Sequence, residues 1–562
     1  MVKLLSHRSA LLLATSVASL LTPAVATETI TVTATKRPQA AIDVPASVTV
    51  LEGNVIGTIN ALNSAEDITQ YVTGLQAAVA NGTQIAFQIR GIGAVDHQAL
   101  TPGAAAVYSD GVFLATNVQT GPLLYDLERV EVLKGPQGSL YGRNASSGAI
   151  NFISVRPSQD QEQYVSVSAG RFDRRDVTAA LGTSLSDSVS VRLAGRLLKQ
   201  DATLDNVVTE PDFPAGPRNE IGERDEWGLK GSLLWEQSEI TKLLLRAHYE
   251  EDNGVNPAPR NNSLEPALDD HEISLGPDGV QDTDNEFFGG SVEFTTSVGG
   301  WDLFSLTAVE GYNQQYGFDF SGSQILTNSF TPNTDPFADP TLNANLAYDR
   351  DFLQFSEELR LSRDTSWGHT MVGVMAAHED FEQRYTIWCG ELDPATLLGT
   401  CRYIAAPRRA GPTPASDGTA FTLDNFIEQD RFTAALFTYN DINLSDRITL
   451  TIGARYTFED IEGKGRGVHI FDDGTVALNN VNPENLEGIG PATGANDIEE
   501  NRLTGNLALR YSLNENNLVY ASFANGYKSG GFNGEVQNNS LHFADVGLFE
   551  AETVNAYEIG YK

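Results

Sequence analysis

The sequence predicts a mainly β protein, in which an export signal and a smaller α/β domain precede a transmembrane antiparallel β-barrel. From about Gln163 onward the chain consists of stretches in which every second residue is apolar. These stretches reach the roughly 9–11 residues that a tilted membrane-spanning strand needs. Short turns and long polar loops alternate between them, a pattern typical of outer-membrane barrels.

The N-terminus has the layout of a signal peptide. Lys3, His7 and Arg8 precede an apolar stretch at 10–21, and small residues at 24 and 26 mark a cleavage site after Ala26. A buried helix of the mature fold is the alternative, but a basic start, a short apolar stretch and a small-residue cleavage site together favour export. We therefore expect residues 1–26 to be a signal peptide.

Residues 447–459 show the strand pattern most clearly. Apolar side chains from Ile448 to Phe458 occupy one face, whereas Arg447, Arg455 and Glu459 lie on the other. A soluble antiparallel sheet also alternates, but its strands are usually only about 5–6 residues long. About fourteen longer strands lie between residues 163 and 562. The long loops lie near 201–225, 252–285, 317–347, 386–425 and 462–499.

Composition excludes several classes of protein. The formal charge of −37 argues against nucleic acid as a partner, because a phosphate-binding surface needs clustered Lys and Arg. We find no motif of a common enzyme class, and the acidic loop near 278–286 lacks EF-hand spacing, so we predict neither an enzyme nor a metal site. In an oxidising compartment, Cys389 and Cys401 are expected to form a disulfide rather than bind a metal.

Residues 40–157 differ from the strand-rich remainder. They are rich in Gly and small residues, with predicted strands at 43–50 and 128–133, a short helix at 64–71 and several tight turns. This pattern predicts a compact α/β domain.

The run DLERVEVLKGPQGSLYGRNASSGAIN at 126–151 closely resembles the plug domain of TonB-dependent outer-membrane receptors. Residues 517–533 and 552–562 resemble the barrel of that family. The segment after the cleavage site resembles its TonB box, although alternating Thr and Ile or Val could also be a plain strand. The residues of this box are Glu28, Thr29, Ile30, Thr31, Val32, Thr33 and Ala34.

The resemblance implies a domain order. Residues 27–39 would be the TonB box and linker, 40–157 the plug domain inside the lumen, and 158–562 the β-barrel. Barrels of the family have about 22 strands around a plugged lumen, against the fourteen expected here. We therefore expect an incomplete barrel that lacks its C-terminal strands, as in a fragment or a truncated product.

The resemblance also implies a function in the outer membrane of a Gram-negative bacterium. The chain would be a receptor for energy-coupled uptake of a scarce solute, with a ferric siderophore as the first choice and no cofactor. Its partners would be the TonB–ExbB–ExbD inner-membrane complex, outer-membrane lipid and lipopolysaccharide, and a metal-chelate or other small-molecule cargo. Alternatives are another cargo (cobalamin, a saccharide or an aromatic compound), a passive surface protein, or a non-functional truncated barrel.

Two sets of residues follow from the resemblance. Cargo contacts are expected from apical plug loops, or these residues are ordinary polar loop positions; the candidates are Asp96, His97, Gln98, Asn117, Gln119 and Thr120. A latch of buried charge pairs is expected between Arg90 or Arg129 of the plug and Glu358 or Glu459 of the wall. The alternative is solvated charges without specific partners. The box is expected to be extended and unpaired with the plug.

Overall fold

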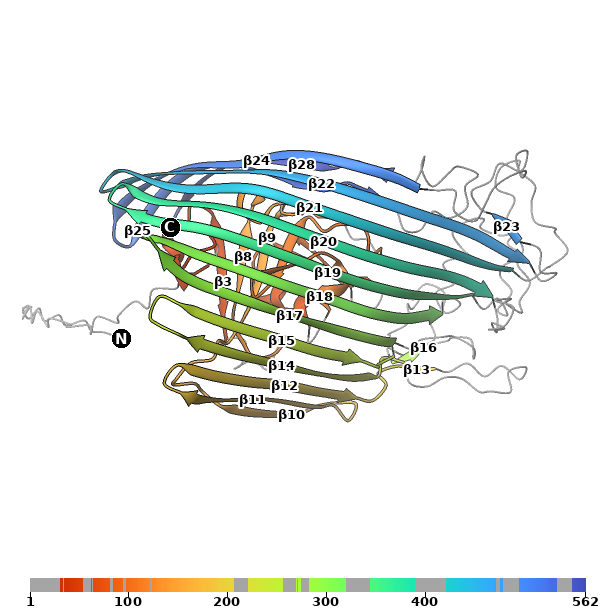
Figure 1. The fold of residues 1–562 in the computed structure, drawn as a ribbon. Helices are drawn as coiled ribbons and strands as arrows, with labels where there is room; N and C mark the ends of the chain where they lie inside the picture. Colours follow the sequence, from red (N-terminus) through yellow and green to blue (C-terminus); the bar gives the residue numbers. More distant parts are fainter. Residues whose placement is uncertain are drawn as a thin grey trace, which may run out of the picture.

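The computed structural model describes most of the chain (Figure 1). The described residues are 31–33, 35–53, 62, 64–80, 84–93, 98–121, 124–206, 221–255, 269, 271–273, 283–319, 344–389, 421–471, 476–478, 495–532 and 548–562. The predicted signal peptide lies outside these residues.

The N-terminal domain is built on a five-stranded sheet with the order β3-β8-β9-β6-β7, in which only β6 and β9 run parallel. Its strands are β3 (Ser47–Glu52), β6 (Ala105–Ser109), β7 (Val112–Leu114), β8 (Leu127–Lys134) and β9 (Gly148–Ser154). A hairpin of β4 (Leu75–Ala80) and β5 (Gln84–Ile89) packs beside it. The alternating apolar residues of β8 and β9 supply buried Val130, Val132, Ile150 and Phe152.

The helices within the described residues of this domain are η1 (Ala41–Asp43), η2 (Ala65–Gln70), η3 (Asn117–Thr120) and α2 (Gly138–Tyr141). A capping box formed by Ser64 and Asp67 begins η2, which lies within the helix predicted at 64–71. Within the described residues, no helix is long and apolar enough to cross a membrane.

The rest of the chain forms one large antiparallel sheet. Its fourteen main strands follow one another in chain order from β10 to β28. They are β10 (Tyr164–Ala169), β11 (Arg175–Ser186), β12 (Val189–Gln200), β14 (Arg224–Glu236), β15 (Lys242–Asp252), β17 (Thr283–Val298), β18 (Trp301–Asp319), β19 (Ala344–Thr365), β20 (Gly368–Cys389), β21 (Phe421–Ser445), β22 (Ile448–Phe471), β24 (Ala495–Asn514), β25 (Asn517–Lys528) and β28 (Glu552–Tyr561). The predicted antiparallel sheet of fourteen strands is confirmed.

Minor strands accompany this sheet. They are β1 (Thr31–Val32), β2 (Gln39–Ala40), β13 (Asp205–Asn206), β16 (Glu272–Ile273), β23 (Val476–Leu478), β26 (Gly531–Phe532) and β27 (Leu548–Phe549). The strand β23 extends the large sheet from β22, and the others pair as β1–β2, β13–β16 and β26–β27.

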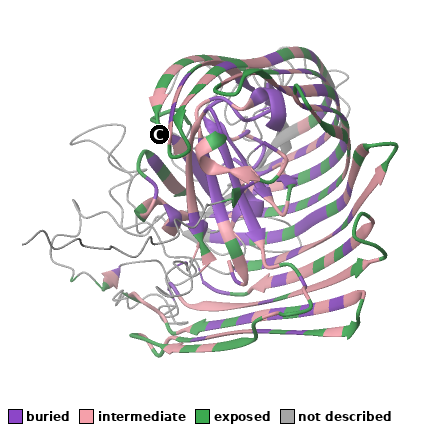
Figure 2. Cartoon of the chain, turned by 90° about the vertical axis from the view of Figure 1, so that its left-hand side faces the viewer, coloured by how far each residue is buried: buried purple, intermediate pink, exposed green. Residues whose placement is uncertain are grey.

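Successive residues of each long strand face opposite sides of the sheet. On β19, Leu353, Phe355 and Leu361 are 43–51% exposed on the outer face, whereas Glu358 and Arg360 point inward, as the sequence predicts. Figure 2 shows the same alternation around the curved wall. An apolar outer face and a polar inner face are what a barrel wall in lipid requires.

The N-terminal domain lies on the concave face of the sheet (Figures 1 and 2), and we call it the plug. Two apolar clusters join it to the wall. Leu140 and Tyr141 pack with Met371, Phe437 and Tyr439 of β20 and β21. Nearer the long-loop end, plug residues 99, 100 and 118 pack with wall aromatics of β17 to β20. The plug is thus held by apolar contacts at two levels of the lumen.

A comparison of two glycines distinguishes the cost of an unfavourable backbone angle from the cost of a steric clash. At Gly148 φ is +155° and a Cβ would lie 2.2 Å from the Leu133 carbonyl oxygen, whereas at Gly91 φ is +77° and a Cβ would meet nothing within 4 Å. We expect Gly148→Ala to lower the free energy of plug unfolding by about 3 kcal/mol or more. Gly91→Ala should cost only about 1–2 kcal/mol. Calorimetric unfolding of the two variants tests this, and equal losses would contradict it.

Candidate functional site

The most deeply buried charges join the plug to the wall. Arg143 follows α2 and forms an ion pair with Glu379 of β20, and its Nε lies 3.7 Å from Glu459 of β22. From the wall itself, Arg431 Nη1 donates to Glu459 at 3.1 Å and its Nε lies 3.8 Å from Glu379. All four residues are at most 6% exposed. We call these four residues the charge cluster.

The charge cluster is balanced, with two guanidinium groups and two carboxylates. Tyr527 of β25 donates a further hydrogen bond to Glu459 at 2.9 Å. Taking ions out of water is costly, and the cost is recovered only when every charge is paired at good geometry. The plug therefore supplies one of the four charges that balance each other in this cluster, and the wall supplies the other three.

The latch pairing predicted for Arg90 and Arg129 is wrong. Arg129 pairs within the plug, with Glu128 and with Glu131 at 2.7 Å. Glu131 is two residues away on the same face of β8, so it is nearer than any wall carboxylate. Arg90 does reach the wall, but it pairs with half-exposed Glu558 of β28 at 2.5 Å.

The two wall carboxylates of the predicted latch bind other cations. Glu459 belongs to the charge cluster with Arg143, and Glu358 pairs with Lys36 at 2.6 Å. Sequence reasoning missed both partners. Arg143 lies within the plug-like run at 126–151, so its place in that run was the available signal, whereas Lys36 lies in the linker and carried none.

The described part of the predicted TonB box is docked on the plug. Thr31 and Val32 pair with Gln39 and Ala40 in a two-stranded ladder. The backbone N–H of Thr33 donates to both carboxylate oxygens of Glu131, at 2.8 and 3.1 Å. The expectation of an extended segment unpaired with the plug is therefore wrong for residues 31–33. Glu28–Ile30 and Ala34 lie outside the described residues.

The linker that follows is anchored to the wall. Lys36 Nζ lies 5.6–5.8 Å from the ring centres of Tyr108, Tyr141 and Phe437, besides its ion pair with Glu358. Burial lowers the pKa of Lys36 to about 8, in spite of that carboxylate. Its neighbour Arg37 pairs with Asp441 of β21 at 2.5 Å. Charge and ring contacts thus fix these two residues to β19 and β21.

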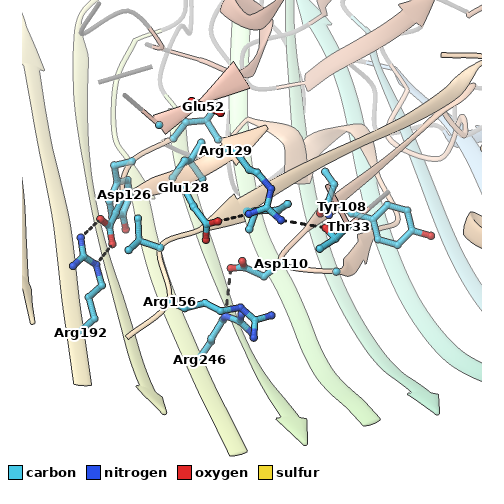
Figure 3. Close-up of a pocket in the computed structure, with 18 of the residues that line it drawn as sticks. Thr33, Glu52, Tyr108, Asp110, Asp126, Glu128, Arg129, Arg156, Arg192 and Arg246 are labelled. Atoms are coloured by element: carbon cyan, nitrogen blue, oxygen red, sulfur yellow. Dashed lines mark hydrogen bonds and ion pairs between the residues drawn. The ribbon is translucent and has the colours of Figure 1, made fainter. Parts of the chain in front are cut away.

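Between the plug and β10 to β19 lies a cavity of about 1430 Å³ (Figure 3). Its walls are charged, and two of the ion pairs drawn there join the plug to the wall. Asp126 binds Arg192 at 2.5 Å, and Asp110 lies 3.6 Å from Arg246. Burial acts to raise the pKa of Asp110, but Arg246 and the hydrogen bonds from Ser154 outweigh it and lower this pKa. These pairs bridge the plug and the wall across a space that has room for water.

Two of the predicted cargo residues already serve the plug's own structure. Gln119 accepts from the Thr116 N–H at 3.1 Å in the capping box of η3. Thr120 Oγ1 donates to the Ile85 carbonyl at 3.0 Å. Asn117 begins η3 at the same loop, and Gln98 is buried. A role in binding cargo stays a prediction for these four. Asp96 and His97 lie outside the described residues.

The predicted disulfide cannot be placed, because Cys401 lies outside the described residues. Cys389 ends β20. In the part of the chain that the structure describes, no three or more His, Cys, Asp or Glu side chains form a group that could hold a metal ion.

These features define a class of protein: a membrane β-barrel wall with a separately folded plug, which is held in the lumen by buried charges and carries its N-terminal segment at the short-turn end. Two family models match the chain. The TonB-dependent receptor plug domain matches residues 40–149, and the TonB dependent receptor-like β-barrel matches residues 235–562. The chain belongs to the TonB-dependent receptors, which are outer-membrane barrel proteins of Gram-negative bacteria and not enzymes.

Curated relatives match parts of the chain. The vitamin B12 transporter BtuB of Vibrio vulnificus is 29% identical over 194 residues, which are 33% of this chain and 31% of the relative. The catecholate siderophore receptor Fiu of Escherichia coli K12 is 29% identical over 155 residues, 27% of this chain and 18% of the relative. The matches thus span less than a third of the length of these relatives.

Solved structures match most of the chain at low identity. The ferric yersiniabactin uptake receptor FyuA from Yersinia pestis has a TM-score of 0.70 at 16% identity, covering 92% of this chain and 69% of that one. The ferric-catecholate import receptor Fiu from E. coli K12, in its closed form, has a TM-score of 0.64 at 18% identity, covering 94% and 72%. At this identity the likeness concerns the fold.

Removal of the plug's cation from the charge cluster should loosen the plug. Arg143→Ala leaves Glu379 and Glu459 short of a counter-charge, and we expect a loss of about 3–5 kcal/mol in plug docking. Arg90→Ala breaks a half-exposed pair and should cost about 1 kcal/mol or less. The measurement is the urea midpoint for protease cleavage within the plug. The view of the charge cluster as the main charged anchor fails if the two midpoints shift equally.

Loss of the Glu131 carboxylate should release the N-terminal segment. We expect Glu131→Ala to remove hydrogen bonds to a charged acceptor, each contributing about 1.5–3 kcal/mol. Trypsin should then cleave after Lys36 about tenfold faster or more, whereas Pro38 blocks cleavage after Arg37. Glu128→Ala, which removes a more exposed carboxylate on the same strand, is the matched control and should leave the rate unchanged.

Proposed function

We propose that this chain acts in energy-coupled uptake of a scarce small-molecule solute across the outer membrane. The observation that carries the proposal is the plug seated on the concave face of the wall by buried charges. A lumen filled in this way does not admit a solute passively, so passage requires the plug to shift. A passive pore or a surface adhesin has no need of such a plug.

The coupling partner in this proposal is the inner-membrane TonB–ExbB–ExbD complex. An extended segment at a mature N-terminus suits recognition by strand addition. Residues 31–33 are extended and are held by a short ladder, by Glu131 and by the burial of Val32 in an apolar cluster. Outer-membrane lipid and lipopolysaccharide are the expected surroundings of the exposed apolar wall, and no nucleic acid is involved.

For the cargo we propose a ferric siderophore. Support comes from relatives and solved neighbours whose names are those of siderophore receptors, among them Fiu and FyuA. Cobalamin is the second candidate, favoured by the match to BtuB. Growth under iron limitation and growth on cobalamin as the sole corrinoid, each with and without the gene, separate the two.

Deletion of Glu28–Ala34 tests the coupling. We expect energised uptake to be abolished while binding of cargo to outer membranes stays nearly intact, because the described part of the deleted segment, residues 31–33, lies away from the long-loop end. Uptake and binding of the same radiolabelled cargo are measured in parallel. Uptake at the wild-type rate after the deletion would contradict the assignment of the box.

A further inference from the structure

Side chains on the inner face of β18, β19 and β20 are arranged in layers. Cross-strand pairing in register places like residues side by side. From the plug toward the long-loop end, the layers are an inner aromatic layer of Tyr312, Phe352 and Phe381, a polar layer of Gln314, Arg350 and Gln383, and an outer aromatic layer of Tyr316, Tyr348 and Tyr385. The inner aromatic layer packs on Val118 of η3. The polar layer is therefore the first polar level of these strands above the plug apex.

Arg350 is held rigidly within the polar layer. Its Nε donates to Gln383 Oε1 at 2.7 Å and its Nη1 donates to Gln314 Oε1 at 2.9 Å. The guanidinium carbon lies 4.1 Å from the ring centre of Tyr348 and 5.5 Å from that of Tyr316. The residue is 0% exposed, and its Nη2 has no hydrogen-bond partner. The Nη2 nitrogen of this buried guanidinium is thus without an acceptor among the described residues.

Arg350 also lacks a counter-charge among the described residues. Other buried or partly buried arginines of the plug and the wall have a carboxylate within 4.0 Å, among them Arg143, Arg192, Arg196, Arg246, Arg360, Arg431 and Arg510. Arg455 has none either, but it lies directly against the plug, where a Cβ on Gly142 would come within 2.9 Å of its guanidinium. A buried charge without a partner is costly. Within the described part of the chain, Arg350 is therefore a buried charge without a counter-charge, and its Nη2 lacks a hydrogen-bond partner.

From this geometry we propose that Arg350 binds an anionic oxygen group of the cargo, a carboxylate or a catecholate. The inference rests on the proposed function, since it requires a solute that reaches the plug apex. The free Nη2 supplies a charge-assisted hydrogen bond, and the rings of Tyr316 and Tyr348, stacked on each other and near the guanidinium, hold that group in place. Because Arg350 is fully covered in this structure, neighbouring side chains must part to admit the anion. The substrate class is therefore an organic anion rather than a neutral or cationic chelate.

The test is equilibrium binding to the receptor in outer membranes. The probes are two anionic ferric chelates (citrate and tris-catecholate), a cationic one (ferrioxamine B), cyanocobalamin, and citrate and 2,3-dihydroxybenzoate without iron. We expect Arg350→Gln to weaken binding of an anionic probe about 10- to 100-fold, as befits a lost charge-assisted hydrogen bond. It should leave any binding of ferrioxamine B or cyanocobalamin unchanged. Arg350→Lys should restore part of the affinity, because it keeps the charge but not the planar fork.

Arg175→Gln is the control, because Arg175 is exposed and pairs only with exposed Asp173. Cold and heated electrophoretic mobility of each variant verifies that the barrel is intact. If only the iron-free anions bind in a manner dependent on Arg350, the iron cargo is wrong and the anion site stands. If no anionic probe binds wild type more tightly than Arg350→Gln, or if Arg350→Gln weakens all probes alike, the inference is overturned.

Discussion

Most buried charges inside this lumen are paired, and the arrangement of the plug on the wall depends on that pairing. The inner face of the sheet is polar because the outer face must be apolar in lipid. Once the plug covers that inner face, its ions lose water, and a partner of opposite charge offsets the cost of this loss. Arg143 between Glu379 and Glu459 is the strictest case, since the wall contributes two carboxylates and only one arginine. The wall alone would be left with a net negative charge at its centre.

The same constraint makes the contact between plug and wall both firm and reversible. Apolar packing of Leu140 and Tyr141 on β20 and β21 buries surface but has little directional preference. The ion pairs are directional, so they fix the orientation of the plug on the wall. Water entering the cavity beside Asp110 and Asp126 can solvate these charges as they separate. A solvated gap on one side and a dry charge cluster on the other suggest a plug that loosens from the wet side first.

The sequence was sufficient for the strands but not for the contacts between distant strands. Alternation along 447–459 is a local property of the pleated chain, so the inward position of Glu459 and Arg455 follows from the sequence alone. Which cation meets Glu459 depends on how the plug is turned in the lumen, and no local pattern encodes that. Arg129 shows the reason for the error: its carboxylate neighbour at 131 satisfies it two residues away. Likewise, the isolation of Arg350 is visible only when β18 and β20 are placed beside β19.

The attachment of Lys36 and Arg37 to β19 and β21 has a mechanical consequence. These residues lie between the box and the plug sheet. Their ion pairs are with the barrel, although Lys36 also lies near the plug rings of Tyr108 and Tyr141. Tension applied at Thr31 would first load the short ladder with Gln39 and Ala40 and the hydrogen bonds from Thr33 to Glu131, and then the ion pairs with the membrane-embedded wall. A pull that also parts both ion pairs would reach β3 and the rest of the plug sheet. Small thermal motions of the N-terminus would thus leave these contacts intact. A sustained force that breaks them would be needed before the plug shifts in the lumen.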